Sequence, residues 1–330
     1  MKTKRIIALL ACCVLTAGLF SGFTTKKAAG SITLRLSDNQ PVGYVTILAD
    51  NLFAKEVAAA TNGRIKIQVY SGSQLGDEKS TIEQLQFGAI DVIRIGAAPL
   101  AEFNKPIGVL ILPYLFKNKD QMFRVLDGKI GDTIFKNLQE AKIVGLCWFD
   151  SGARSFYNTK KDVKSPEDLK GLKIRVQESK LMMDMVKSLG ASPTPMAYGD
   201  VYSALQTGVI DGAENNWPSY LTANHYQVAK HITVDEHTRV PEMIAFSKLT
   251  WDKIAPADQI LIRKAAKDAA TYERIVWLQQ TQTAIHAIQK KGTVKITYLK
   301  TNKAFQDKVQ GMYAEHPEYK DMITSIMNTK

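Results

Sequence analysis

The sequence has few cysteines, and their positions exclude several kinds of structure. Only 3 of the 330 residues are cysteine, and two of them, Cys12 and Cys13, fall in an apolar N-terminal run. Cys147 is therefore alone in the rest of the chain, which excludes an intramolecular disulfide and a cysteine metal cluster there. Because it lies within the apolar phrase LCWFD, we interpret Cys147 as a small core residue.

The short motifs of common enzyme families are also absent. The chain contains no G-x-S-x-G, H-E-x-x-H, P-loop or G-x-G-x-x-G motif, and its 5 histidines do not have metal-ligand spacing. We therefore expect a protein that is not an enzyme and that needs neither a cofactor nor a metal. One alternative stays open, a secreted hydrolase or lyase that uses Glu78 or His237 as its base.

A basic surface for nucleic acid is missing despite the formal charge of +11. Five of the 43 basic residues and none of the 32 acidic ones lie in the first 30 positions, so the remainder carries 38 basic and 32 acidic residues. That remainder has no basic run and no basic patch interleaved with aromatic residues. The composition therefore favours a soluble protein with a mild preference for anions over a nucleic-acid-binding protein.

The N-terminus has the pattern of a secretion signal. Basic residues in 2–5 precede an apolar run over 6–23, and small residues occupy 28–30. We expect residues 1–30 to be a signal peptide that sends the protein to the periplasm. A lipid anchor on Cys12 and a retained membrane anchor are the alternatives, and no later segment is apolar enough to cross a membrane.

Strand and helix patterns alternate in the rest of the chain. Apolar residues alternate over 31–37 and 65–69, with helical spacing over 44–61 between them. Strand, helix, strand is typical of a parallel sheet covered by helices. Residues 121–139 are predicted as one helix. Residues 256–291 are predicted as a helix of about 50 Å, long enough to run along two domains.

An internal repeat indicates two related α/β domains. LQFGAID at 85–91 returns as LQTGVID at 205–211, an offset of 120 residues with five of seven positions identical, and each copy leads from a helix into a strand. We predict two lobes with a ligand cleft between them. Lobe I comprises residues 31–151 and about 240–279, and lobe II comprises 152–239 and about 280–330.

The stretch Gly171–Ser179, GLKIRVQES, places an arginine in a predicted buried strand. Apolar Leu172, Ile174 and Val176 alternate with polar residues, so Arg175 lies on the opposite face. A guanidinium keeps its charge and fits a carboxylate with two parallel hydrogen bonds, so an arginine at a strand end that faces a cleft can hold an acid. The alternative is an arginine on a solvated strand face.

Other polar side chains fall at or just after the predicted carboxyl ends of strands, the edge at which open α/β sheets bind ligands. Two cations, several amides and one carboxylate, with aromatic rings nearby, describe a site for a small acid that carries hydroxyl groups. The candidate ligand-binding residues are Arg175, Arg154, Asn215, Asn39, Glu78, Tyr198, Asn216, Trp217 and His237.

Several phrases together resemble the solute-binding proteins of tripartite ATP-independent periplasmic (TRAP) transporters. They are SQLGDEK, LPYLF, DLKGLKIRVQES and LGASPTPMAYGDVYSALQTGVIDGAENN, followed by the long C-terminal helix. The resemblance covers the predicted mature chain. It implies a two-lobed periplasmic binding protein fold of type II-like character, with a mixed, mostly parallel sheet in each lobe and a C-terminal helix along both. It also implies closure by a hinge and a membrane permease as partner.

The resemblance also assigns roles to residues. It implies that Arg175 forms the main salt bridge to a substrate carboxylate, that Arg154 is the second arginine, and that Asn215 and Asn39 contribute amides. Tyr198 stands where an aromatic ring commonly packs on the ligand.

GDEK with Glu78, RVQES and GAENNWPSY resemble the members that bind hexuronates such as glucuronate or galacturonate. Binding of a C4-dicarboxylate or another organic acid, or presentation of the ligand to a sensor, are the alternatives.

Overall fold

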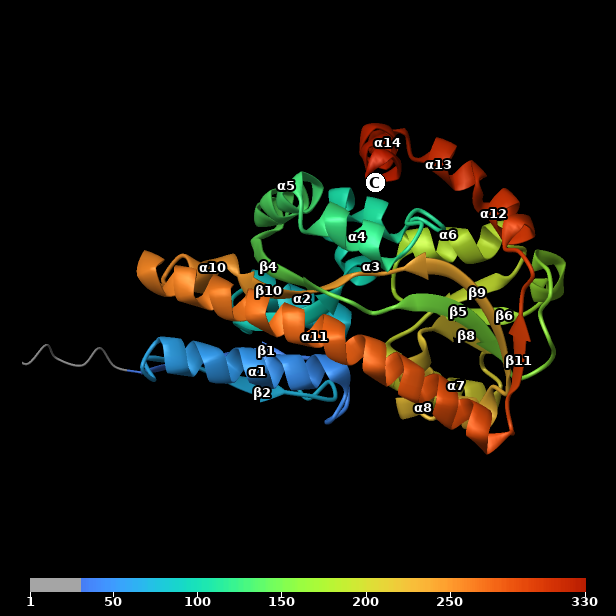
Figure 1. Cartoon of the computed structure of the whole chain (residues 1–330), viewed down its shortest axis with the longest axis horizontal. Coiled ribbons are helices and arrows are strands. Elements are labelled where there is room, and N and C mark those ends of the chain that lie inside the picture. Colours follow the sequence, from blue (N-terminus) through green and yellow to red (C-terminus); the bar gives the residue numbers. More distant parts are fainter. Residues whose placement is uncertain (1–30) are drawn as a thin grey trace, which may run out of the picture. The chain divides into compact units, whose positions relative to one another are not determined.

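Two mixed β-sheets organise the part of the chain that the structure describes, residues 31–330 (Figure 1). The structure is a computed structural model. The predicted signal peptide and Cys12 lie outside the described residues. Over 31–330, every helix is too short or too polar to cross a membrane.

The first sheet has five strands in the order β2-β1-β3-β10-β4. β1 pairs in parallel with β2 and β3, whereas β10 pairs antiparallel with β3 and β4. The strands are β1 (Ile32–Ser37), β2 (Ile65–Tyr70), β3 (Val92–Gly96), β4 (Ile143–Phe149) and β10 (Glu242–Ser247). Cys147 of β4 is buried in the apolar core of this sheet, as predicted.

The second sheet has six strands in the order β11-β9-β5-β8-β6-β7. Three of its five pairings are parallel, whereas only two of the four in the first sheet are. Two mixed sheets were predicted correctly, but the prediction of mostly parallel sheets is wrong for the first, because β10 enters between β3 and β4. The strands are β5 (Ala153–Asn158), β6 (Lys173–Val176), β7 (Ser192–Pro195), β8 (Gly212–Asn215), β9 (His231–Arg239) and β11 (Lys295–Tyr298).

Helices flank both sheets, and one predicted helix is broken. Residues 121–139 fall in two helices, because the backbone is extended at Gly128 between them. The second helix starts so close to the end of the first that a Cβ at Gly131 would lie 1.8 Å from the carbonyl oxygen of Leu126. The helices that follow the first-sheet strands are α1 (Val45–Ala60), α2 (Glu78–Gln86), α3 (Ala97–Leu100), α4 (Lys119–Leu126), α5 (Lys129–Leu138) and α10 (Lys248–Trp251). The others are α6 (Lys180–Ser188), α7 (Val201–Thr207), α8 (Trp217–Thr222), α9 (His225–Val228), α11 (Pro256–Lys291), α12 (Lys303–Val309), α13 (Gly311–Glu315) and α14 (Lys320–Asn328).

The two copies of the repeat make the same structure. α2 leads into β3 and α7 leads into β8. Gly88 and Gly208 have φ of 73° and 76°, the left-handed conformation that glycine adopts at low cost. The aspartate that closes each phrase then accepts a hydrogen bond from a backbone N–H of the neighbouring parallel strand. Asp91 Oδ2 lies 2.8 Å from the nitrogen of Arg35, and Asp211 Oδ2 lies 2.9 Å from that of Lys173.

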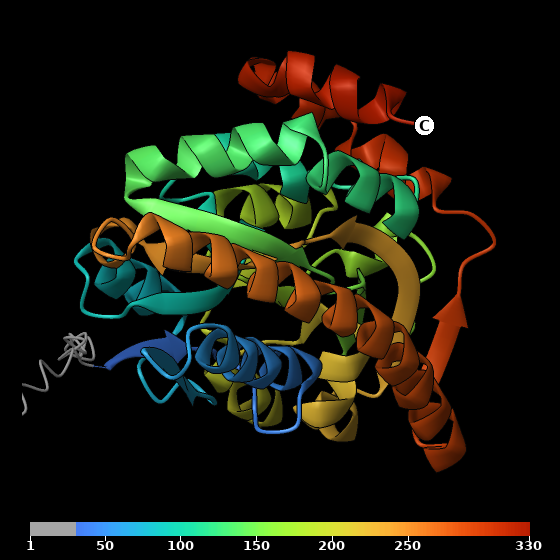
Figure 2. The same cartoon turned by 60° about the vertical axis from the view of Figure 1, so that its left-hand side comes forward.

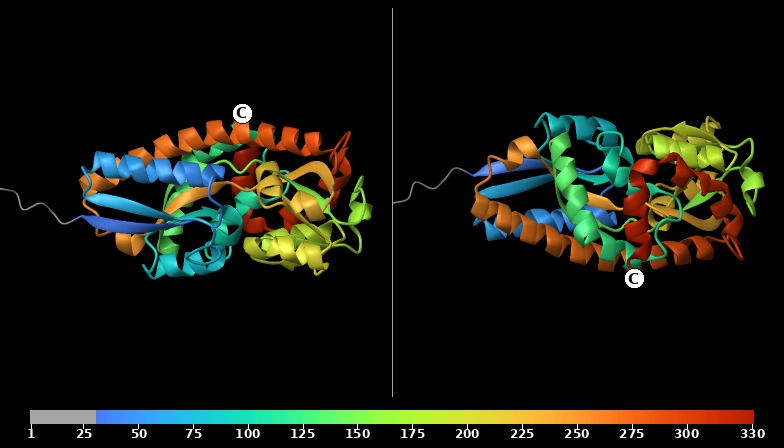
Figure 3. Two further views of the ribbon diagram at one scale, coloured as in Figure 1. Left: turned by 90° about the horizontal axis from the view of Figure 1, so that it is seen from below. Right: turned by 90° about the horizontal axis from the view of Figure 1, so that it is seen from above.

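Helix α11 runs along both sheets, as predicted (Figures 2 and 3). It begins with Pro256, which lacks an N–H, and this costs no hydrogen bond because N–H groups in the first turn have no partner within the helix. Gly292, with φ of 64°, caps its C-terminal end. Its first half packs Ile262, Ala266 and Ala269 into the core of the first sheet. Its last turns place Ala284 and Ile288 in the core of the second sheet.

The chain crosses between the sheets twice more. β4 belongs to the first sheet and β5 to the second, and β9 belongs to the second and β10 to the first. Between these strands lie the short segments 150–152 and 240–241. These crossings bring the carboxyl ends of β1 and β3 and the first residue of β10 close to the carboxyl ends of β6 and β8. The assignment of every residue to one of two lobes stays a prediction.

Candidate functional site

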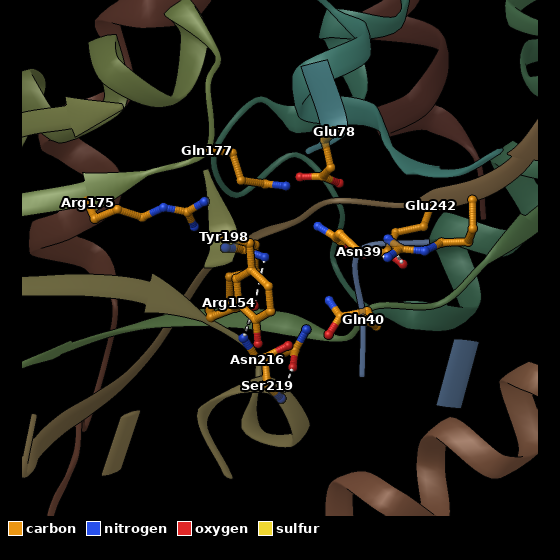
Figure 4. A pocket seen from close by; sticks show the side chains of 12 residues that line it. Asn39, Gln40, Glu78, Arg154, Arg175, Gln177, Tyr198, Asn216, Ser219 and Glu242 are labelled. Atoms are coloured by element: carbon orange, nitrogen blue, oxygen red, sulfur yellow. Dashed lines mark hydrogen bonds and ion pairs between the residues drawn. The ribbon is translucent and has the colours of Figure 1, made fainter. Parts of the chain in front are cut away.

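A polar cavity lies where the two sheets meet (Figure 4). Residues at the carboxyl ends of β1, β6 and β8 contribute to it, together with the first residues of α2 and β10. Its lining is entirely polar or aromatic: Asn39, Gln40, Glu78, Arg94, Arg154, Arg175, Gln177, Tyr198, Asn215, Asn216, Ser219 and Glu242.

Most of the predicted site residues lie together in this lining. They are Asn39, Glu78, Arg154, Arg175, Tyr198, Asn215 and Asn216. Two do not line the cavity. Trp217 is packed in an apolar core and borders a different hollow, and His237 is fully buried.

The sequence analysis did not include Gln40, Arg94, Gln177, Ser219 and Glu242. A usable signal existed for two of them. Gln177 lies two positions after Arg175 and so shares its face, and Arg94 interrupts the apolar strand VIRIG much as Arg175 interrupts LKIRV.

Arg175 is a buried cation without an internal counter-charge. Its side chain is on β6, and the residue is only 2% exposed. The carbonyl oxygen of Met196 accepts hydrogen bonds from Nε at 3.0 Å and from one terminal nitrogen at 2.6 Å. No acidic side chain among residues 31–330 forms an ion pair with it. Burial lowers the pKa of Arg175, with Glu214 opposing and Arg154 adding to that effect. A charge held in this way is stabilised by an anion that enters the cavity.

Arg154 is, by contrast, largely satisfied inside the protein. It donates to Glu214 Oε1 at 2.8 Å, to the Glu214 carbonyl oxygen at 2.8 Å and to Asn215 Oδ1 at 2.9 Å, and its Nε donates to Glu214 Oε2. Burial acts to raise the pKa of Glu214, but Arg154 and His237 outweigh it and lower that pKa to about 2. Four of the five guanidinium N–H groups are thus engaged, and one is left to contact a ligand.

His237 is buried next to the Arg154–Glu214 ion pair and contacts Glu214 on the side away from the cavity lining. Its Nδ1 lies 2.9 Å from Asp235 Oδ2 and its Nε2 lies 3.3 Å from Glu214 Oε2. Burial acts to lower the pKa of His237, but Asp235 and Glu214 outweigh it and raise that pKa to about 9. A fully buried imidazolium between two carboxylates cannot take a proton from a ligand in the cavity, so His237 does not fit the role of base in the hydrolase alternative.

The first sheet carries a matching ion pair of reversed polarity. Arg94 and Glu214 occupy equivalent positions of the repeat, each three residues after its aspartate. Arg94 donates to Glu242 Oε2 of the adjacent antiparallel strand at 3.0 Å and also bonds to the side chains of Asp38 and Asn39. Burial raises the pKa of Glu242 to about 7; Arg94 opposes this shift and Glu78 reinforces it.

The asparagine amides have fixed orientations. Asn215 Oδ1 accepts from Arg154 and from the backbone nitrogen of Asn216, and Asn216 Oδ1 accepts from the nitrogen of Ser219 at 2.8 Å. Asn39 Oδ1 accepts from Arg94. Because each carbonyl oxygen has an internal donor, each NH₂ group remains to donate to a ligand. The lining therefore offers amide donors, the free cation of Arg175 and the carboxylates of Glu78 and Glu242, a combination that can bind a hydroxylated acid. Within 31–330, no three His, Cys, Asp or Glu side chains are arranged so that they could hold a metal ion.

The profile of the bacterial extracellular solute-binding proteins, family 7, matches residues 36–319. The chain belongs to this family. A solute-binding protein of Chromohalobacter salexigens is 38% identical, and the alignment covers all of both chains. The chain is therefore a binding protein and not an enzyme, because family 7 consists of extracellular solute-binding proteins.

Two solved structures extend the comparison with this family 7 protein. A TRAP periplasmic solute-binding protein from Chromohalobacter salexigens with bound D-glucuronate is 40% identical, with a TM-score of 0.87 over 90% of this chain and 100% of that chain. Another from Xanthobacter autotrophicus, with bound β-D-galacturonate, is 43% identical, with a TM-score of 0.87 and the same coverage. These structures confirm the predicted resemblance to TRAP solute-binding proteins and the predicted two-lobed fold.

The buried charges of this solute-binding protein predict how its stability changes with pH. The folded pKa of Glu242, about 7, lies above the value of 4.5 for an unfolded chain, so the folded state binds more protons and loses stability as the pH rises from about 4.5 to 7. His237, at about 9 against 6.5, contributes stability that is present below 6.5 and is lost as the pH rises to 9. Glu214 acts oppositely and loses its contribution as the pH falls from 4.5 to about 2.

Burial lowers the pKa of His225 from 6.5 to about 3, so its contribution to stability is lost as the pH falls below 6.5 and opposes that of Glu242 between pH 5 and 6.5. We therefore expect the ligand-free protein to lose roughly 3 kcal/mol as the pH rises from about 6.5 to 9, the size of the His237 shift. Urea unfolding at about pH 5, 7 and 9 measures this. Glu242→Gln is the control, because it removes the loss that Glu242 contributes below pH 7 and leaves the loss between pH 7 and 9. Constant or rising stability from pH 7 to 9 contradicts the prediction.

Proposed function

We propose that this protein captures a hexuronate, D-glucuronate or D-galacturonate, outside the cytoplasm and delivers it to a TRAP-type membrane permease. In this proposal, residues 1–30 direct secretion to the periplasm, with anchoring through Cys12 as the alternative. The ligand binds in the polar cavity, and the two lobes close on it by a hinge.

Arg175 carries the proposal. A guanidinium that is 2% exposed and has no acidic partner among the described residues needs an anion, and its free N–H groups open onto the cavity. A ligand carboxylate supplies that anion with two parallel hydrogen bonds. Arg154 has one N–H left and adds a weaker second contact, while Tyr198 offers a ring against which a sugar can pack.

The rest of the cavity supports a ligand with hydroxyl groups. Glu78 is an acceptor for hydroxyl protons, and the NH₂ groups of Asn39, Asn215 and Asn216 are donors for hydroxyl oxygens. A plain C4-dicarboxylate has no hydroxyl proton to give to Glu78. The glucuronate and galacturonate bound to the two related structures support the same ligand class for this chain.

Isothermal titration calorimetry against D-glucuronate, D-galacturonate, succinate, pyruvate and sialic acid tests the ligand. We expect the tightest binding with a hexuronate. Succinate and pyruvate have no hydroxyl group and leave Glu78 or an asparagine amide desolvated without a partner, at about 1–3 kcal/mol for each group, and sialic acid is larger than a hexuronate. Tighter binding of succinate than of both hexuronates would move the protein to the dicarboxylate-binding members. Binding of none of the five would refute the proposed site.

A further inference from the structure

The two sides of the cavity carry opposite charge. The second sheet supplies the unpaired Arg175, and the first sheet and its helix α2 supply the carboxylates of Glu242 and Glu78. Figure 4 shows both carboxylates across the cavity from Arg175. A ligand whose carboxylate binds Arg175 therefore points its other end at two acids.

The single arginine on the first-sheet side of the lining does not cancel these charges. Arg94 is shared between Asp38 and Glu242, and it also bonds to Asn39. One positive charge thus faces three carboxylates once Glu78 is counted. A second carboxylate on the ligand would enter a region of net negative charge, and like charges in close contact cost several kcal/mol in an interface.

Glu242 has an acceptor available for the ligand. Its Oε2 takes the hydrogen bond from Arg94 Nη1 at 3.0 Å, while no hydrogen bond within 31–330 engages its Oε1. Its side chain is 11% exposed, and this exposure is toward the cavity that it lines. This oxygen can accept a proton from a hydroxyl group, and it repels a carboxylate at the same place.

The position of Glu242 is set by the sheet rather than by a loop. It is the first residue of β10, paired with Gly96 of β3 on one side and Phe149 of β4 on the other. The backbone before it is held as well, because the carbonyl oxygen of Pro241 accepts from the nitrogen of Ala97 at 2.9 Å. A carboxylate fixed in this way cannot move aside for a second anion at low cost.

We propose that Glu242 is the residue by which this site distinguishes a sugar monoacid from the diacid of the same carbon skeleton. The inference rests on the proposed function. A hexuronate places a hydroxyl group at the end that faces Glu242, whereas the corresponding aldarate places a carboxylate there. Selectivity then comes from repulsion of the wrong ligand as well as from attraction of the right one.

The ionisation of Glu242 makes this selectivity depend on pH. The charged or titratable groups that act on it come from several elements: Arg94 of β3, Asp38 after β1, Glu78 of α2, Arg154 of β5, Tyr44 and Asp50 at α1, and Glu273 of α11. Burial, with Glu78 and Asp38, raises its pKa to about 7 against the opposing effect of Arg94 and Arg154. Glu242 is therefore mostly charged at pH 8 and mostly protonated at pH 6, whereas sugar-acid carboxyl groups remain ionised at both.

Calorimetry with D-galacturonate and galactarate, which share one carbon skeleton, tests the proposal at pH 6 and pH 8. We expect wild-type protein to prefer galacturonate by about 100-fold at pH 8 and by several-fold less at pH 6. In Glu242→Gln the preference should fall by about tenfold at pH 8 and become equal at the two pH values. Glu78→Gln is the matched control, because it removes one carboxylate from the same side and leaves Glu242 in place. A dependence on pH should remain in this variant, moved to lower pH because Glu78 helps to raise the pKa of Glu242.

The outcomes separate the two proposals. Wild-type protein that binds neither of these acids nor D-glucuronate refutes the proposed function. If galacturonate binds but Glu242→Gln keeps the wild-type preference at both pH values, Glu242 does not determine specificity and the proposed function stands. The wild-type measurement decides even if the variant fails to fold, since a preference that is the same at pH 6 and pH 8 overturns the inference.

Discussion

Arg175→Ala is expected to weaken binding of the best hexuronate by roughly 30- to 5,000-fold. The change leaves a desolvated ligand carboxylate without its partner in the cavity, a loss that typically costs about 2–5 kcal/mol. Arg154 cannot compensate, because Glu214 and Asn215 already engage four of its five N–H groups. Titration calorimetry of wild type and variant with the same ligand measures the loss.

Arg175→Lys is expected to remain clearly impaired. An ammonium keeps the charge but lacks the planar fork that binds Met196 and a carboxylate together. The matched control is Arg124→Ala on the exposed face of α4, which should alter affinity by no more than about 0.5 kcal/mol. Near-native affinity in Arg175→Ala would remove the carboxylate anchor from the proposed site.

Glu214→Ala is expected to destabilise the ligand-free protein by about 3–5 kcal/mol. Glu214 is fully buried and is the acidic partner of both Arg154 and His237. Removing it leaves a buried guanidinium without its counter-charge and an imidazolium with Asp235 alone, and removing one member of a buried pair typically costs this much. Urea unfolding at pH 7 without ligand measures the change.

Asp127→Ala is the control for Glu214→Ala, because it breaks an arginine–carboxylate pair at the surface. Asp127 accepts two hydrogen bonds from Arg274, at 2.6 and 2.8 Å, but its side chain is 51% exposed. Exposed pairs contribute about 0–1 kcal/mol, so this variant should unfold close to wild type. If both variants lose the same small amount of stability, the ion pairs of Glu214 with Arg154 and His237 do not stabilise the folded protein as proposed.

Local patterns in the sequence were enough to predict the elements that have a clear period. Alternation identified the strand of Arg175 and its polar face, and helical spacing from Pro256 to Lys291 identified the helix along both sheets. The repeated phrase ending at Asp91 and Asp211 predicted two related units, because it encodes the same glycine turn and the same aspartate contact. Such features depend on residues close in sequence.

Tertiary structure alone decided which charges are paired and which are free. Arg94 and Glu242 are 148 residues apart and meet because β10 enters between β3 and β4. That same insertion makes the first sheet half antiparallel, and no period in the sequence indicates it. His237 looked available as a base in the sequence, but the second sheet buries it between Asp235 and Glu214.

The composition, the repeat and the alternation around Arg175 therefore determined by themselves the α/β class, the two related units and a candidate anion site. The sequence did not determine that Arg175 is unpaired while Arg154 is neutralised, nor that Glu242 faces the cavity. Side-chain direction within a strand follows from its period of two, whereas a counter-charge comes from whichever strand becomes the neighbour. The order of strands in a sheet depends on packing over the whole chain, and only the folded structure contains it.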